Sequence, residues 1–283
     1  MAIKRTPYLT NKELMREIHR SKNSYCSYLT TEDHQYDLIL PSLEKINQRT
    51  VAEAKRARAD RLAKQAWEAN QLAGIKSKLD DHAVDWKKIK KSEVIFRIIT
   101  WDHIPLAPGR KKTPKTSGDL HAKINFPPFQ HYRYDDAGEL ICVGKSHWEG
   151  GLANGWFNKD HGTMSNNLAR MFMKLCERFG SKGNWRGYTY NDEMRSQALL
   201  QLSQVGLQFD ESKSNNPFAY YTATIANSFT RVLNVEKRNQ NLRDDILEMN
   251  NLNPSYTRQT ENSIKAKEIV VADIDPTSLI GKS

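Results

Sequence analysis

The last third of the chain most constrains the fold, because helical periodicity alternates there with short polar links. Three segments carry this periodicity, at 164–180, 191–209 and 216–239. Asn216 is a suitable N-cap for the third segment, and Pro217 suits the first helical position. Apolar stripes separated by short links are typical of packed helices. The sequence therefore predicts a compact helical domain over 164–249.

Two further helices are expected before this domain. In YLTNKELMREI, Thr10 and Glu13 have the spacing of a capping box, and Leu9 and Leu14 that of a hydrophobic staple, so residues 1–20 should hold a short helix. A long basic helix is predicted over 42–78 from its Ala, Lys and Arg content. Its apolar stripe consists mostly of small residues (Val51, Ala54, Ala57, Leu62, Ala66).

The middle of the chain has a different texture. EVIFRIIT and HYRYDDAGELICV are rich in β-branched and aromatic residues, and Asp135 to Gly138 form a turn signal between strands. A small β region is therefore predicted over 92–145, and with the basic helix it forms an inserted α+β module of unknown fold over 21–163. Residues 250–283 are polar and lack periodicity, which predicts a flexible C-terminal tail. The expected fold class is mainly α.

Composition excludes several classes of protein. The 283 residues include 43 Lys and Arg against 33 Asp and Glu, a net charge of +10. The sequence lacks the 18 to 20 residue apolar run of a membrane span and the apolar core of a signal peptide. Three distant cysteines (Cys26, Cys142, Cys176) fit neither a disulfide framework nor a four-cysteine zinc site. A protein of the cytoplasm without a membrane partner is expected.

The positive charge favours an anionic partner, because Lys and Arg attract phosphate whatever the base sequence. Much of the excess lies between Pro41 and Lys91, where 13 basic residues face seven acidic ones. A solvated helix face and a polyanion contact explain this segment equally well, so both interpretations stay open.

The helix expected after Pro217 has two distinct faces. One is an apolar stripe that should face a core: Phe218, Tyr221, Ile225, Phe229 and Val232. The other carries an aromatic ring, amides, hydroxyls and basic groups: Tyr220, Asn227, Thr230, Arg231, Asn234, Lys237 and Arg238. Asn and Thr can bond base edges, Arg and Lys neutralise phosphates, and Tyr stacks on an unpaired base. A merely solvated face is the alternative.

Three blocks of sequence resemble a known family. YLTNKELMREI, GNWRGYTYNDEM and FDESKSNNPFAYYTATIANSF are similar to the promoter-melting and promoter-reading segment of bacterial-type sigma factors. The similarity is greatest to the late-transcription sigma factors of T-even-like bacteriophages. With their connecting helices, the blocks cover residues 8–20 and 164–240. The resemblance implies a sigma region-two-like helical domain, interrupted by the 21–163 insert.

The resemblance implies a promoter-specificity subunit with no catalytic activity, metal or cofactor. It would direct host RNA polymerase to phage late promoters in the bacterial cytoplasm. Tyr220 lies where an aromatic captures a flipped base of an AT-rich minus-ten-type element. Asn227 and Thr230 lie where base edges are read, and Arg231, Asn234, Lys237 and Arg238 complete the DNA-binding set. Primary sigma factors have paired tryptophans where this chain has Ala223 and Thr224, so melting would either be weaker or rely on other residues such as Trp185, Tyr188 or Tyr221.

The helix at 192–208 corresponds to the family's contact with the coiled coil of the largest polymerase subunit. Met194, Ala198, Leu202 and Val205 should pack internally, which leaves Glu193, Arg195, Gln197, Gln201 and Gln204 as candidate polymerase contacts. The phage family also uses a coactivator and a DNA sliding clamp. Leu279 and Ile280 are the candidate clamp-binding residues near the C-terminal end.

Two other classes of protein share some of these features. Asp102, His103, Asn154, Asn158 and His161 loosely resemble a metal-dependent His-Asn-His nuclease, but their spacing is long. Cys142, His147 and His161 lack a fourth zinc ligand. A nucleic-acid-binding or polymerase-associated protein that is not a sigma factor shares the basic charge, but does not require Tyr220, Asn227 and Thr230 together.

Overall fold

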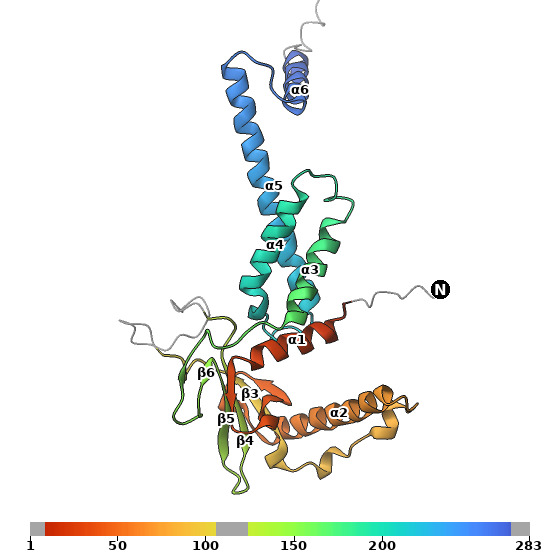
Figure 1. Cartoon of the computed structure of the whole chain (residues 1–283), viewed down its shortest axis with the longest axis vertical. Helices are drawn as coiled ribbons and strands as arrows, with labels where there is room; N and C mark the ends of the chain where they lie inside the picture. The colour runs from red at the N-terminus through yellow and green to blue at the C-terminus, as the bar shows by residue number, and fades with distance from the viewer. Residues whose placement is uncertain (1–8, 106–123, 273–283) are drawn as a thin grey trace, which may run out of the picture.

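The computed structural model describes residues 9–105 and 124–272, with side chains as far as residue 265. Figure 1 shows a helical part above a small sheet, with the first helix between them. About 55% of the residues are helical and 12% lie in strands, which confirms the mainly α class. The helices are α1 Asn11–Asn23, α2 Gln48–Leu72, α3 Asn166–Gly180, α4 Asn191–Val205, α5 Pro217–Met249 and α6 Tyr256–Ala272.

The main sheet has five strands in the order β1-β5-β4-β3-β2, of which only β2 and β3 pair in parallel. Its hairpin forms as predicted, since the Gly138 amide donates to the Asp135 carbonyl at 3.1 Å in the turn. The sheet extends beyond the predicted 92–145 region, because residues from upstream supply both edges. The strands are β1 Cys26–Tyr28, β2 Leu38–Leu40, β3 Ile95–Ile99, β4 Phe129–Tyr134 and β5 Leu140–Ser146, with a separate pair β6 Trp148–Glu149 and β7 Trp156–Phe157.

Local capping explains where the helices begin. Thr10 and Glu13 form the predicted capping box of α1, and Asn216 accepts from the Ala219 amide at 3.1 Å at the start of α5. The basic helix is shorter than the predicted 42–78. Its N-cap is Asn47, and the positive φ of 76° at Gly74 follows its last turn.

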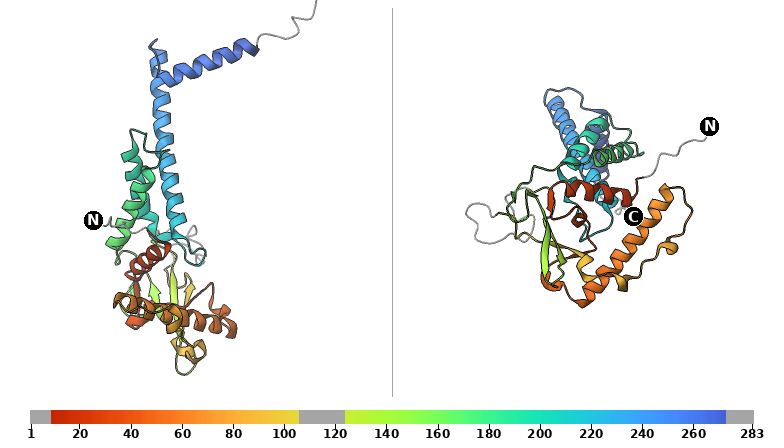
Figure 2. Two further views of the ribbon diagram at one scale, coloured as in Figure 1. Left: turned by 90° about the vertical axis from the view of Figure 1, so that its right-hand side faces the viewer. Right: turned by 60° about the horizontal axis from the view of Figure 1, so that its bottom comes forward.

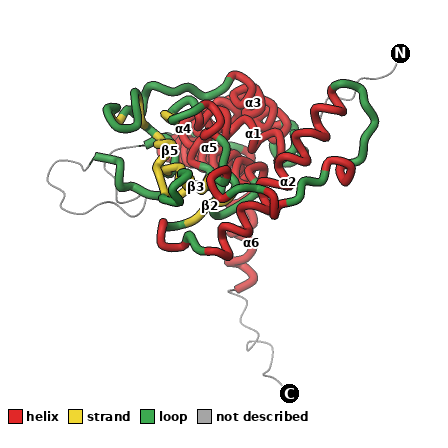
Figure 3. The backbone as a smooth tube through the Cα atoms, turned by 90° about the horizontal axis from the view of Figure 1, so that it is seen from below, coloured by secondary structure: helices red, strands yellow, loops and turns green. Residues whose placement is uncertain are grey.

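Helix α2 packs beside the sheet on small residues. Ala54 and Ala59 are buried against Phe96 and Ile98 of β3. Figure 3 shows α2 beyond the sheet edge formed by β2. Small side chains allow this close approach, and they leave the charged face of α2 exposed to solvent.

The helical core joins α1 to α3, α4 and α5. Leu14 and Ile18 of α1 are fully buried in one cluster with Phe172 of α3, Leu202 of α4 and Phe229 of α5. Phe126 and Phe129, from the region predicted as a separate insert, belong to the same cluster. One face of the sheet therefore shares a core with the helical domain across the predicted boundaries at 20 and 163, while the other face packs with α2 in a separate cluster.

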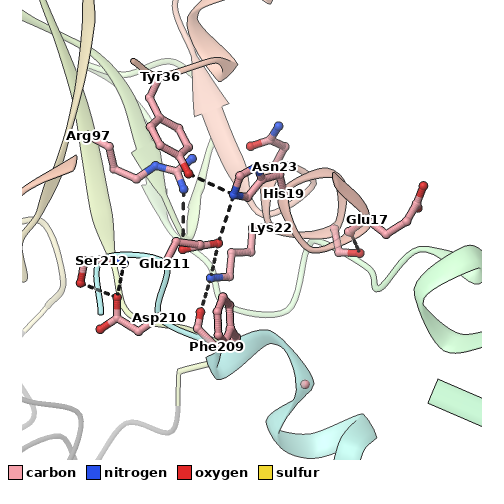
Figure 4. A network of polar contacts seen from close by, with 12 residues as sticks. Glu17, His19, Lys22, Asn23, Tyr36, Arg97, Phe209, Asp210, Glu211 and Ser212 are labelled. Atoms are coloured by element: carbon pink, nitrogen blue, oxygen red, sulfur yellow. Dashed lines mark hydrogen bonds and ion pairs between the residues drawn. The ribbon is translucent and has the colours of Figure 1, made fainter. Parts of the chain in front are cut away.

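A buried network of charges reinforces this junction (Figure 4). The Lys22 ammonium of α1 donates to Glu211 Oε1 at 2.8 Å and to the Phe209 carbonyl at 2.7 Å, and Arg97 Nη1 of β3 lies 3.9 Å from Glu211 Oε2. Burial alone would raise the pKa of Glu211, but the charges of Lys22 and Arg97 lower it to about 2. Glu211 is therefore ionised at neutral pH, and it links three separate segments of the chain.

The C-terminal part differs from its prediction. Helix α5 extends to Met249, ten residues beyond the predicted segment, and Figure 2 shows its second half projecting away from the core. The predicted flexible tail contains α6. Ser255 connects the two helices, because its amide and hydroxyl donate to the two carboxylate oxygens of Asp244 at 2.8 and 2.7 Å. The sequence offered no strong periodicity here, and none of the α6 side chains described, up to residue 265, is buried.

Candidate nucleic-acid interface

Seven of the predicted site residues meet in a groove between α4 and α5. Its volume is about 750 Å³. The two helices run antiparallel, so Gln204 near the end of α4 faces Tyr220 near the start of α5. Lining residues from α4 include Glu193, Gln197, Gln201 and Gln204, and those from α5 include Tyr220, Thr224, Asn227, Ser228 and Arg231. We call this the α4–α5 groove.

The α4–α5 groove combines two predicted sets that were assigned to different partners. Four of the five candidate polymerase contacts line it, as do Tyr220, Asn227 and Arg231 from the DNA-binding set. The fifth polymerase candidate, Arg195, lies in another hollow between α3 and α4 and forms an ion pair with Asp192. Sequence periodicity placed each set on its own helix, but it could not show that both sets face the same groove.

Tyr220 lies at one end of the groove and is half-buried. Its hydroxyl donates to the Val205 carbonyl at 3.3 Å, and its ring meets the Phe209 ring edge to face with centroids 5.6 Å apart. Burial raises the pKa of Tyr220, so the phenol is neutral at pH 7. The ring is thus held in place by its neighbours instead of extending freely into solvent.

The polar face of α5 continues beyond the α4–α5 groove. A shallower hollow of about 540 Å³ is shared by Asn227, Arg231, Thr230, Asn234 and Arg238. At 1.5 Å per residue, the face from Asn227 to Arg238 is about 16 Å long. Lys237 is exposed on α5 but lines neither hollow.

The side chains of this face have no partners within the described part of the chain. Asn227, Thr230, Arg231, Asn234, Lys237 and Arg238 form no side-chain hydrogen bond or ion pair with any described residue. A structural asparagine behaves differently, since the Asn191 amide donates to the Gly180 and Trp185 carbonyls at 3.0 and 2.9 Å. The α5 face therefore keeps its donors and acceptors available for a ligand.

The apolar faces of both helices largely follow prediction. Met194, Ala198 and Leu202 of α4 are fully buried, whereas Val205 is only partly buried. On α5, Tyr221, Ile225 and Phe229 are buried and Val232 is partly buried. The prediction for Phe218 is wrong, because the first turn of α5 lies at the rim of the core and leaves this ring 42% exposed.

The three aromatic residues expected to assist melting have different environments. Tyr221 is fully buried and donates its hydroxyl to the Gly206 carbonyl at 2.7 Å, so it cannot reach a base. Trp185 and Tyr188 are partly buried beside one another, with ring centroids 6.1 Å apart. Trp185 also packs on Phe179 and Phe229. Tyr221 is therefore a core residue, and the other two remain candidates.

The residues of the nuclease and zinc hypotheses do not form a metal site. Among the described residues, no group of three or more His, Cys, Asp or Glu side chains could hold a metal ion. The Cys142 thiol donates to the Gly144 carbonyl, and His161 contacts the Asn158 carbonyl at 2.8 Å. His147 is fully buried against Phe126, and burial lowers its pKa to about 3.

Sequence reasoning missed a second groove, between α1 and α2, that is lined by basic side chains. The sequence does indicate the α1 side of this groove, since Lys12, Arg16 and Arg20 recur every four residues and so share one face of that helix. The α2 residues that face this row, Arg61 and Lys64, lie in the basic segment between Pro41 and Lys91, where charge alone does not distinguish one face from another. Because the two helices are far apart in sequence, their meeting could be learned only from the fold.

The candidate clamp-binding residues Leu279 and Ile280 lie outside the described residues. Among the described helices, none has the length and apolar character needed to cross a membrane. Comparison with protein-family models, curated proteins and solved structures gave no match.

Proposed function

We propose that this protein is an RNA polymerase sigma factor for phage late promoters, with a sigma region-two-like helical domain. The observation that carries the proposal is the unpartnered amide, hydroxyl and basic face of α5 beside the half-buried ring of Tyr220. This chemistry suits nucleic-acid binding in general, and the resemblance of three sequence blocks to late sigma factors supports that particular class of protein. Bacterial core polymerase and late promoter DNA are the proposed partners, in the host cytoplasm.

In this proposal, Tyr220 receives a base unstacked from an AT-rich element. Pyrimidine–purine TA steps unstack easily, and stacking on an aromatic ring stabilises the base once it is out of the duplex. The Phe209 and Val205 contacts hold the Tyr220 ring in position before DNA arrives. The ring therefore loses little freedom on binding.

The rest of the face divides between base edges and phosphates. Asn227 and Thr230 would bond to base edges, with Asn234 one turn further along α5. Arg231, Lys237 and Arg238 would neutralise phosphates and fix the register of α5 on the strand. The approximately 16 Å length of the face matches a few nucleotides, which suits a short promoter element.

The polymerase contact would use the far side and the rim of α4. Glu193 and Gln197 lie at the end of the α4–α5 groove opposite Tyr220, and Arg195 faces α3. Gln201 and Gln204 line the same groove as Tyr220. Polymerase bound to them would therefore leave less room in the groove for the flipped base. A coactivator and a sliding clamp, acting through Leu279 and Ile280, complete the proposed set of partners.

Run-off transcription tests the proposal. Bacterial core polymerase is combined with the protein on a template that carries an AT-rich late-type element, with and without coactivator and clamp. A transcript with a defined start is expected only when the protein is present. If none of these combinations gives a defined start, the sigma assignment is wrong, and a nucleic-acid-binding protein of another kind remains.

Tyr220 variants sharpen this test. Tyr220→Ala should weaken binding to pre-melted promoter DNA by about 1–3 kcal/mol, the range for a lost stacking contact. Tyr220→Phe keeps the ring and removes only the hydroxyl bond to Val205, so it should bind almost as the wild type does. Equal binding of all three proteins to pre-melted DNA would contradict base capture by Tyr220.

A further inference from the structure

A basic groove lies between α1 and α2, on the opposite side of α1 from the buried core. Its volume is about 610 Å³. Figure 1 shows α1 above α2, and the groove is lined by side chains of both helices. The basic lining residues are Lys12, Arg16 and Arg20 on α1, Arg61 and Lys64 on α2, and Arg97 on β3. We call this the α1–α2 groove.

The basic residues of α1 form a regular row. Lys12, Arg16 and Arg20 are four residues apart and share one face, so the row extends about 12 Å along the helix. All three are exposed, and the Arg16 side chain keeps 70% of its accessible surface. Across the groove, Arg61 and Lys64 extend the positive surface onto α2.

Acidic neighbours compensate only part of this charge. Lys12 pairs with Glu68, and Arg61 pairs with Asp37. Arg16 lies 3.9 Å from Glu17, whose carboxylate also accepts from Ser165. Across the described ranges, neither Arg20 nor Lys64 forms an ion pair.

The lowered pKa of Glu68 is consistent with a positive electrostatic potential in the α1–α2 groove. This pKa is lowered by the hydrogen bond from Lys12 and, beyond that bond, by the charges of Lys12, Lys64 and Arg16. A carboxylate stabilised by several surrounding cations indicates a positive potential in the groove. Glu68 is the groove's one acidic lining residue in the described part of the chain.

Arg97 adds a buried charge to the lining. Its guanidinium is 1% exposed and lies between the rings of Tyr36 and Phe129, at 3.8 Å from each centroid. Its Nε donates to His131 Nε2 at 2.9 Å, while Nη1 has no hydrogen-bond partner among the described residues and is 3.9 Å from Glu211. Since burial is the main cause that lowers the pKa of His19 to about 4, this histidine adds no charge at neutral pH.

We infer that the α1–α2 groove binds the sugar-phosphate backbone of a nucleic-acid strand. A 12 Å row of cations spans three or four phosphates, which follow one another at 3.4 Å per nucleotide along the axis of a duplex strand. An acidic protein segment fits less well, because Met15 is the sole aliphatic apolar side chain among the described lining residues. The centre of a protein interface is normally depleted in charged residues, whereas this groove carries six basic side chains. The inference does not depend on promoter reading by α5.

The test measures binding of the full-length protein to labelled DNA of random sequence, as a single strand and as a duplex, by fluorescence anisotropy at several salt concentrations. The variant Arg16→Gln/Arg20→Gln/Lys64→Gln removes three exposed charges from the groove. Binding should weaken by about tenfold or more at 0.1 M salt. The slope of log K against log salt should fall by about 2 for the single strand and nearly 3 for the duplex.

The matched control is Arg49→Gln/Lys76→Gln/Lys88→Gln, which removes three exposed charges outside the groove. Both triple variants should show the circular dichroism and melting temperature of the wild type, because all six positions are exposed. The control should keep most of the affinity. An equal loss in both variants would mean unspecific attraction by net charge and would overturn the inference.

Glu68→Gln supplies a test of opposite sign. Removal of this carboxylate should strengthen DNA binding about two- to fivefold, the scale of one exposed ion pair. Unchanged or weaker binding would contradict a phosphate site. A polyglutamate peptide should compete poorly, and competition equal to that of single-stranded DNA would assign the groove to acidic proteins instead. None of these measurements uses polymerase, so their failure is distinct from failure of the sigma proposal.

Discussion

The α4–α5 groove and the α1–α2 groove are similar in volume but differ in chemistry. The first is lined mainly by uncharged amides and hydroxyls, and its charged lining residues are two acidic ones, Glu193 and Glu236, and one basic one, Arg231. The second carries six basic side chains against Glu68 alone in its described lining. Amides can distinguish base edges, whereas cations attract every phosphate equally. Under the two proposals, selectivity would rest on the α4–α5 groove and most of the attachment on the α1–α2 groove.

The two regions also differ in how they are held together. The α4–α5 groove rests on an apolar core of helices, and no histidine follows His161 in the sequence. The α1–α2 groove rests on buried polar groups, among them Arg97, His131 and the Lys22–Glu211 pair. Conditions that change ionisation should therefore affect the second region before the first.

Mild acid should have the largest effect. Burial lowers the pKa of His19 and His103 to about 4, that of His147 to about 3, and that of His131 well below its ordinary value. In the unfolded chain these histidines bind protons near pH 6.5. Their contribution to the free energy of unfolding is therefore fully present above that pH and is lost as the pH falls towards 4. Each histidine contributes about 1.4 kcal/mol per pH unit in this window.

Hydrogen exchange by mass spectrometry, corrected for intrinsic rates, would measure this loss. Peptides from β4 and β5 should lose protection between pH 7 and 5, while peptides from α3 and α4 keep theirs. A parallel loss in both regions would show that the two do not differ in their response to acid.

Removal of Lys22 should have the next largest effect. Lys22→Ala leaves the Glu211 carboxylate buried without its ammonium partner, so the free energy of unfolding should fall by about 3–5 kcal/mol. Urea unfolding of the wild type and the variant at pH 7 measures this difference in the free energy of unfolding. Lys12→Ala is the control, since its exposed pair with Glu68 should contribute about 1 kcal/mol or less. Similar losses in the two variants would contradict a stabilising role for the buried network.

Loss of amides from α5 should change selectivity instead of stability. Asn227→Ala should reduce the difference in binding between a cognate and an altered promoter element by about 1–3 kcal/mol. Binding to random DNA should stay unchanged, because no phosphate contact is removed. Competition anisotropy with the two duplexes measures the difference. If Asn227→Ala weakens binding to both duplexes equally, the amide is not a base reader.

Lys237→Gln should have the smallest effect. Lys237 is exposed and lies outside both hollows of α5, so its proposed role is one phosphate contact. The salt slope should decrease by about 0.9, with no change in discrimination between promoter elements. A change in discrimination would mean that Lys237 reads bases, which would extend the selective face to a residue outside both hollows.

Local patterns made several elements predictable. The capping box at Thr10, the cap at Asn216 with Pro217, and the hairpin turn at Asp135 each depend on residues within about four positions of one another. Burial of Tyr221, Ile225 and Phe229 followed from helical spacing for the same reason. Errors arose where the tertiary position overrode a local signal, as for Phe218, whose ring has core spacing but is exposed at the rim, and where the local signal was weak, as for α6 within the predicted tail.

The sequence by itself determined the helical segments, the hairpin, the two-faced character of α5 and the positive charge, because each is a property of neighbouring residues. Only the tertiary structure decided which faces meet. It brought the α4 amides opposite Tyr220, buried Glu211 against Lys22 and Arg97, and placed the basic row of α1 across from α2. These contacts join residues up to about 190 positions apart, as Lys22 and Glu211 are, and they depend on the packing of the shared core.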